Sequence, residues 1–62
     1  MTDAERAYLI AGLLMDYPTA TVHDIRDVVD EATRTVQSVL PDAPLAKVEE
    51  IARIRLDVRV ER

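Results

Sequence analysis

Residues 21–40 read TVHDIRDVVDEATRTVQSVL, and this stretch decides the fold because its apolar residues recur at spacings of three and four. Such spacings place one apolar stripe on a helix of 3.6 residues per turn. The stripe consists of Val22, Ile25, Val28, Val29, Ala32, Val36, Val39 and Leu40. The opposite side of this helix is charged and polar, so the stripe predicts a surface helix that the flanking segments must cover.

The segment before this stretch predicts a first helix over residues 3–16. Thr2 and Glu5 form the T-x-x-E pattern of a capping box, in which each side chain accepts a hydrogen bond from the other residue's backbone N–H. Pro18 disfavours helical geometry at the residue before it, so the helix is expected to end near Asp16. A second N-cap is expected at Thr21.

This first helix is apolar on two sides. One side is bulky and suits the core, with Leu9, Ile10, Leu13, Leu14 and Tyr17. The other side is mostly small, with Ala4, Ala7, Tyr8, Ala11, Gly12 and Met15. A helix that is apolar on both sides is expected to be buried on both. Because three short helices cover only one side well, the small side predicts contact with another chain.

The sequence PDAP at residues 41–44 breaks the chain, and a third helix is expected over residues 43–58 with Asp42 as its N-cap. Its expected core stripe is Leu45, Val48, Ala52 and Leu56. Within residues 54–60, however, apolar and charged residues alternate strictly, which is the period of a strand. A helix would instead place Ile51, Ile54 and Val58 on a second apolar stripe. The absence of a turn residue favours the helix, and the strand is the alternative.

Composition and charge narrow the possible functions. A chain of 62 residues allows one small domain, over residues 1–62, whose core is marginal without a disulfide, a metal or a partner chain. The chain has no Cys and one His, which leaves a partner chain as the expected support. The net charge of −4 argues against binding of nucleic acid or anionic membranes. Without a basic signal-peptide start or a long apolar run, we expect a cytoplasmic protein.

No motif predicts catalysis, a cofactor or a metal site. His23 and Asp27 are four residues apart, but two ligands do not make a metal site. Ser38 has no base near it in sequence, and Gly12 is the only Gly, so no Gly-rich phosphate loop exists. The acidic side of the second helix and the arginines near the C-terminus are expected to be solvated, with docking of a charged partner as the alternative. We therefore expect a non-enzymatic protein.

One aromatic-Pro pair and several apolar residues at helical spacings lie within residues 7–59. They comprise residues 13–18 (LLMDYP), Ile25, Val28, Val29, residues 51–53 (IAR) and Leu56. This pattern resembles that of small bacterial proteins described as having a three-helix bundle dimerisation domain. In these proteins an aromatic-Pro pair closes the first helix, and an amphipathic helix and an Ala-Arg-rich helix follow. The resemblance implies dimerisation and supplies no catalytic residues.

We therefore predict an all-α three-helix bundle, with helices over residues 3–16, 22–40 and 43–58, that assembles as a two-fold dimer. The predicted interface combines the small side of the first helix with the outer stripe of the third: Ala4, Ala7, Tyr8, Ala11, Gly12, Met15, Ile51, Ile54 and Val58. One alternative is an adaptor or antitoxin-like module whose apolar surface binds a different protein. Another is a DNA-binding helix-turn-helix.

Overall fold

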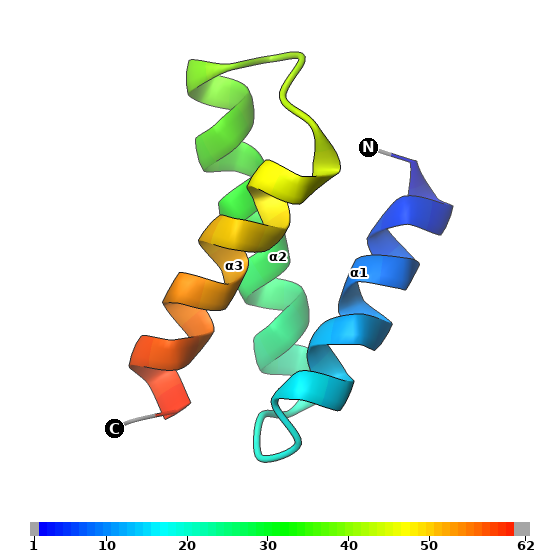
Figure 1. Ribbon diagram of the computed structural model, residues 1–62, viewed down its shortest axis with the longest axis vertical. Coiled ribbons are helices and arrows are strands. Elements are labelled where there is room, and N and C mark those ends of the chain that lie inside the picture. The colour runs from blue at the N-terminus through cyan, green and yellow to red at the C-terminus, as the bar shows by residue number, and fades with distance from the viewer. Residues whose placement is uncertain (1, 61–62) are drawn as a thin grey trace.

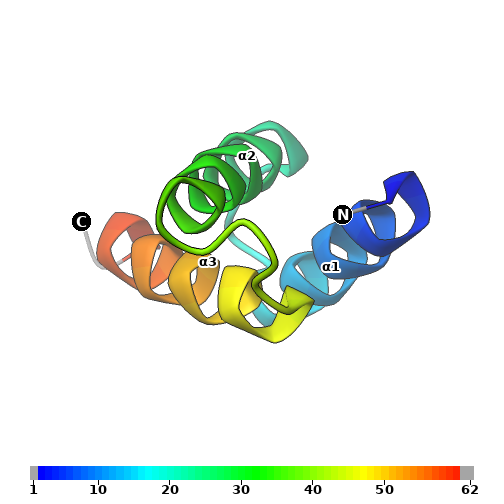
Figure 2. The same ribbon diagram turned by 90° about the horizontal axis from the view of Figure 1, so that it is seen from above.

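The computed structural model describes residues 2–60, which form three helices: α1 (Asp3–Asp16), α2 (Val22–Val39) and α3 (Leu45–Val60) (Figure 1). α1 and α3 run in the same general direction, and α2 runs back between them. Seen from above, α2 lies across the space between α1 and α3 (Figure 2). The prediction of an all-α three-helix bundle is confirmed.

Two threonines begin the first two helices, as predicted. Thr2 Oγ1 accepts a hydrogen bond from the Glu5 N–H at 3.1 Å, and the Thr2 N–H donates to Glu5 Oε1 at 3.1 Å. The pKa of the Glu5 carboxyl is lowered from its ordinary value, mainly by the hydrogen bond from the Thr2 backbone. Thr21 Oγ1 accepts from the Asp24 N–H at 3.1 Å. Each hydroxyl thus satisfies a donor that the first helical turn leaves free.

The bounds of the second and third helices differ from the prediction. α2 ends at Val39 and Leu40 is its C-cap, one residue earlier than expected. A start of α3 at residue 43 with Asp42 as N-cap is wrong, because α3 begins at Leu45. Pro44 explains the later start, since its ring disfavours helical geometry at the residue before it.

The end of α3 resolves the alternation between residues 54 and 60. This segment is helical through Val60, so the strand alternative is wrong, and the predicted end at residue 58 is two residues short. The alternating side chains do not share one face. Leu56 is fully buried, whereas Ile54 and Val58 are exposed. The helical period therefore separates residues that a strand would have placed together.

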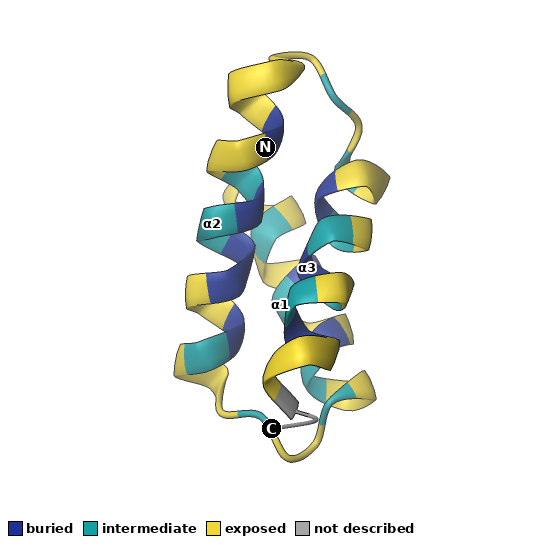
Figure 3. Ribbon diagram, turned by 90° about the vertical axis from the view of Figure 1, so that its left-hand side faces the viewer, coloured by how far each residue is buried: buried dark blue, intermediate teal, exposed yellow. Residues whose placement is uncertain are grey.

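The core is aliphatic and lies along one side of α2. Within the described part of the chain, the buried residues are Leu9, Leu13, Ile25, Val28, Val29, Ala32, Val36, Val48, Ala52 and Leu56. Figure 3 shows the buried positions of α2 gathered on the side that faces the other helices. No polar or charged residue among those with described burial is buried. Five residues of the apolar stripe predicted for residues 21–40 are thus in the core, whereas Val22, Val39 and Leu40, at the ends of the stripe, are exposed.

Ion pairs at the rim of this core join all three pairs of helices. Arg6 Nη2 lies 2.9 Å from Asp30 Oδ1 between α1 and α2, and Arg55 Nη1 lies 3.0 Å from Glu31 Oε2 between α3 and α2. Arg53 Nη2 lies 2.6 Å from an Asp16 carboxylate oxygen between α3 and α1. Half-exposed pairs of this kind contribute at most about 1 kcal/mol each. Their main effect is to fix how each helix is rotated about its axis.

Candidate interaction surface

The small side of the first helix faces solvent along its whole length. We call it the α1 outer face; its residues are Ala4, Ala7, Tyr8, Ala11, Gly12 and Met15, and all six are exposed. Tyr8 and Met15 are 78% and 84% exposed, on the side of the helix opposite Leu9 and Leu13. Large apolar side chains exposed on the same face of a helix are typical of an interaction surface.

The α1 outer face carries no charge. The four charged residues of α1 lie on other sides of the helix. Asp3 and Glu5 lie in the first turn, where carboxylates suit the positive end of the helix dipole. Arg6 and Asp16 turn toward the rim of the core and form ion pairs with α2 and α3. An uncharged face can be covered by another apolar surface without leaving a charge unpaired.

The fold of the single chain does not explain why residue 12, on this face, is a glycine. A Cβ atom built at Gly12 would meet no atom within 4 Å, and the residue does not have positive φ. Glycine inside a helix costs about 0.5–1 kcal/mol relative to alanine. Neither packing nor backbone geometry within the described chain therefore requires glycine at this position.

The α3 part of the predicted interface lies on a different flank of the molecule. Ile54 and Val58 are exposed and line a shallow pocket with Glu31 of α2. Ile51 is half-buried against the core and lines a second pocket with Val39 and Leu40. We call these five apolar residues, Val39, Leu40, Ile51, Ile54 and Val58, the α2–α3 surface.

The structure therefore does not bring the two parts of the predicted interface together. The side of α3 that faces α1 is occupied by Arg53 and Asp57, which contact Asp16 and Tyr17. The residues Ile51, Ile54 and Val58 lie on the other flank of α3, next to residues of α2. One two-fold contact on the α1 outer face would leave the α2–α3 surface free.

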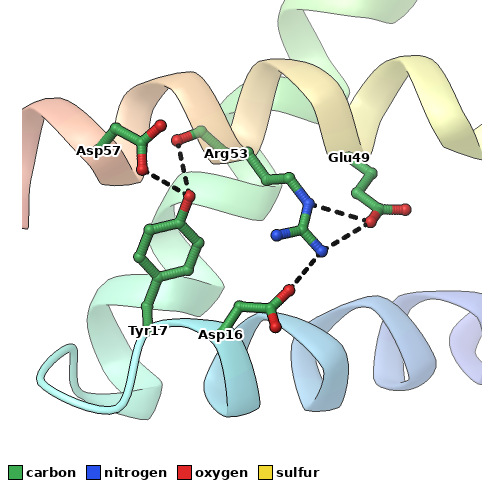
Figure 4. Close-up of polar contacts among 5 residues, drawn as sticks. All are labelled: Asp16, Tyr17, Glu49, Arg53 and Asp57. Atoms are coloured by element: carbon green, nitrogen blue, oxygen red, sulfur yellow. Dashed lines mark hydrogen bonds and ion pairs between the residues drawn. The ribbon is translucent and has the colours of Figure 1, made fainter.

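A polar cluster that the sequence reasoning missed holds the end of α1 on α3 (Figure 4). The Tyr17 hydroxyl donates to Asp57 Oδ1 at 2.6 Å and lies 3.3 Å from the backbone oxygen of Arg53. The Arg53 guanidinium contacts Asp16 at 2.6 Å and Glu49 at 2.9 Å. The cluster is consistent with the rotation of α1 that buries Leu9 and Leu13 in the core and leaves the α1 outer face toward solvent.

Two pKa values report these contacts. The pKa of Tyr17 is raised, first because its hydroxyl donates to the Asp57 carboxylate and then because it is partly desolvated. The pKa of Arg53 is raised by its hydrogen bonds to Asp16 and Glu49. The aromatic-Pro pair at residues 17–18 is the one sequence signal that pointed to this end of α1. It gave no indication of Asp57, which lies 40 positions along the chain.

Tyr17→Phe is expected to lower the free energy of unfolding by about 1 kcal/mol, because a hydrogen bond to a carboxylate is lost while the ring remains. Tyr8→Phe makes the same chemical change at an exposed position and is expected to stay within about 0.5 kcal/mol of the parent. Urea denaturation of dilute protein measures both. Equal losses in the two variants would mean that the Tyr17–Asp57 contact contributes nothing specific.

The other charged candidates have ordinary surface partners. His23 Nε2 lies 3.4 Å from Asp27 Oδ2, and both side chains are exposed. Across residues 2–60, no group of three or more His, Asp or Glu side chains is placed to hold a metal ion. Arg55 is paired with Glu31 inside the chain, and Arg62 lies outside the described residues. Glu31 of the acidic side of α2 and Arg55 of the C-terminal arginines are therefore each other's partners within one chain.

A cleft of about 190 Å³ opens between the start of α1, the end of α2 and residues 41–45. Its polar side chains are Glu5, Thr33 and Gln37. Glu5 already takes part in the capping box, and Thr33 Oγ1 donates to the Val29 backbone oxygen at 2.8 Å. Typical small-molecule sites occupy about 300–1,000 Å³ and present several convergent polar groups. This cleft therefore indicates no ligand class.

No helix in the described part of the chain is both long and apolar enough to cross a membrane. The likeness to dimerisation-domain proteins stays a prediction that no comparison tests. No family model, no curated protein and no solved structure matches this chain.

Proposed function

We propose that this chain is a small, non-enzymatic three-helix module that forms a homodimer through the α1 outer face. The observation that carries the proposal is the uncharged face itself, on which Tyr8 and Met15 are exposed beside Gly12. Burying a large apolar side chain contributes about 1.5–3 kcal/mol. A chain with so small a core gains more from such burial than a larger domain would.

A second copy of the chain is the partner that best suits this face. A two-fold interface brings the same patch of each chain together. An uncharged patch then meets an uncharged patch, and neither chain buries an unpaired charge, which would be costly. The dimer would require no change in the backbone of either chain, since all six residues are already exposed.

The expected dimer is weak. α1 has 14 residues and is therefore about 21 Å long. Two helices of this length offer only a small contact, whereas stable specific interfaces bury at least about 1,000 Å². Binding must also offset at least about 4 kcal/mol of lost translational and rotational freedom. We expect a dissociation constant of the order of micromolar, about −8 kcal/mol of binding free energy.

Sedimentation equilibrium over a wide concentration range tests the proposal. The chain has a mass of 7.0 kDa, and the average mass should rise toward twice that value as the concentration increases. Circular dichroism on the same samples shows whether helicity grows with assembly. A helical monomer at every concentration, up to millimolar, would contradict the homodimer.

Gly12→Leu is expected to have opposite effects on the monomer and on the dimer. The monomer should gain about 1 kcal/mol, because leucine is a better helix former and nothing in the chain obstructs its side chain. The dimer should weaken at least about tenfold, because the added bulk separates the paired helices. Sedimentation equilibrium and urea denaturation measure the two effects.

Gly12→Ala is the matched control, since it brings the same gain in helix propensity with one methyl group of bulk. It should dimerise more tightly than Gly12→Leu. If Gly12→Leu dimerises as well as the parent, the α1 outer face lies outside the interface.

The α2–α3 surface supports a second candidate function, that of an adaptor or antitoxin-like module that binds a different protein. Ile54 and Val58 are 58% and 52% exposed on a flank that an α1 dimer would not use. Immobilised Gly12→Leu protein, which is impaired in self-association, tests this function. A specific partner that Ile54→Asp releases would support it, and retention of no partner would oppose it.

A further inference from the structure

We propose that the two α1 helices pair in antiparallel orientation, with the two-fold axis passing at the level between Leu9 and Ile10. In this arrangement Tyr8 packs against the partner's Ala11, and Met15 packs against the partner's Ala4. This inference rests on the proposed homodimer and adds the orientation and register of its interface. Three features of the α1 outer face carry it: spacing, residue size and the position of charge.

The spacing of the α1 outer face is the same in both directions. Its central residues are Ala4, Tyr8, Ala11 and Met15, at steps of four, three and four. Ala7 and Gly12, at its edges, also lie at equal distances from the midpoint between residues 9 and 10. A helix turned end for end about that midpoint therefore places every residue of this face at the level of another one. A two-fold antiparallel pair centred on this midpoint can therefore use the whole of the face.

Large and small residues alternate along the α1 outer face. In an antiparallel pair, each large residue therefore lies opposite a small residue of the partner. Along the central row the order is Ala4, Tyr8, Ala11, Met15: small, large, small, large. In the antiparallel pair each large side chain meets a small residue of the partner, and Tyr8 also lies near the level of the partner's Gly12. Close-packed interiors need such interdigitation of large and small residues. The empty space at Gly12 then receives part of the partner's aromatic ring.

A parallel pair would fit poorly. It places Tyr8 opposite the partner's Tyr8 and Met15 opposite the partner's Met15. These contacts hold the two backbones apart at two levels and leave gaps beside Ala4 and Ala11. Unfilled space of at least a methyl group costs about 1 kcal/mol at each site. The same six residues thus favour one orientation over the other.

The charges at the ends of α1 favour the same orientation. Asp3 and Glu5 lie in its first turn, and Asp16 at its last residue is bound by Arg53 at 2.6 Å. A parallel pair would bring two acidic first turns together, which is unfavourable. An antiparallel pair instead places each acidic first turn at the level of the partner's Asp16, a single carboxylate whose charge Arg53 partly offsets. It also aligns the two helix dipoles in opposite directions.

Thiol cross-linking tests the register, because the chain has no cysteine of its own. Chains carrying Ala4→Cys and chains carrying Met15→Cys are mixed, oxidised or treated with a short bismaleimide, and analysed by mass spectrometry. In the antiparallel pair, residue 4 and the partner's residue 15 lie at one level, whereas the two copies of residue 4 lie about 16 Å apart along the axis. Disulfides require Cα atoms within about 7 Å. We expect mixed cross-links to exceed like-with-like cross-links by at least about tenfold.

Ser38→Cys, on the exposed outer side of α2, is the matched control and should cross-link poorly with either variant. Sedimentation equilibrium of each cysteine variant before cross-linking shows whether it dimerises. Like-with-like cross-links, a statistical mixture, or no cross-link in a sample that is dimeric would each overturn the antiparallel register and leave the homodimer intact. Absence of a dimer in the parent chain would instead overturn the proposed function.

Discussion

Leu56→Ala is expected to lower the free energy of unfolding by about 2–5 kcal/mol, the range for leucine side chains removed from a core. Leu56 is 0% exposed and belongs to the α3 side of the core. A chain of this length has a total stability of about 3–9 kcal/mol. With the middle values of both ranges, the variant loses about half of its stability. Urea denaturation followed by circular dichroism measures the loss.

Ile54→Ala is the matched control for this prediction. Ile54 lies two residues from Leu56, has a side chain of the same size, and is 58% exposed. Its loss should cost less than about 1 kcal/mol, because little apolar area leaves the core. Similar losses in both variants would mean that the two side chains share one buried face, as in a strand, and would contradict the helical register of α3.

The same segment shows why periodicity alone did not decide the structure of residues 54–60. Strict alternation is compatible with a strand of period two. It is equally compatible with a helix that exposes Ile54 and Val58 while burying Leu56. The decisive factor is the neighbour, since the stripe of α2 offers a continuous apolar surface along which a helix can pack. Tertiary packing of this kind is absent from a local pattern.

Ala11→Glu is expected to prevent dimerisation with little effect on the monomer. Ala11 is exposed in the centre of the α1 outer face, so the monomer should change by less than about 0.5 kcal/mol. In a two-fold dimer each chain brings one such carboxylate into the interface. Like charges brought together there cost several kcal/mol. We expect the dissociation constant to rise at least about 100-fold, a change of about 2.8 kcal/mol.

Sedimentation equilibrium measures this change, and Ser38→Glu adds the same charge on the outer side of α2 as a control. The control variant should dimerise like the parent chain, because Ser38 lies outside the α1 outer face. A dimer that survives Ala11→Glu unchanged would exclude the α1 outer face as the interface. Weakening by both variants alike would point to general charge repulsion rather than a specific surface.

Composition and helical spacing were enough to identify the residues of the α1 outer face. They were not enough to place Ile51, Ile54 and Val58, which the sequence suggested as part of the same interface. Their position depends on which flank of α3 faces α1. In the structure this flank carries the contacts Asp16–Arg53 and Tyr17–Asp57, between residues about 40 positions apart. Periodicity describes the faces of one helix and carries no information about which neighbour each face meets.

α1 is held in the core by fewer residues than α2, and this difference affects the order in which the helices unfold. α1 contributes Leu9 and Leu13 to the described buried core, whereas α2 contributes five residues. Elements with few buried contacts open at a lower free energy than the rest of a protein. We therefore expect α1 to detach before the helix pair α2–α3 opens. A dimer formed through α1 would stabilise this least protected helix. Each association event would then raise the free energy of opening α1 in two molecules at once.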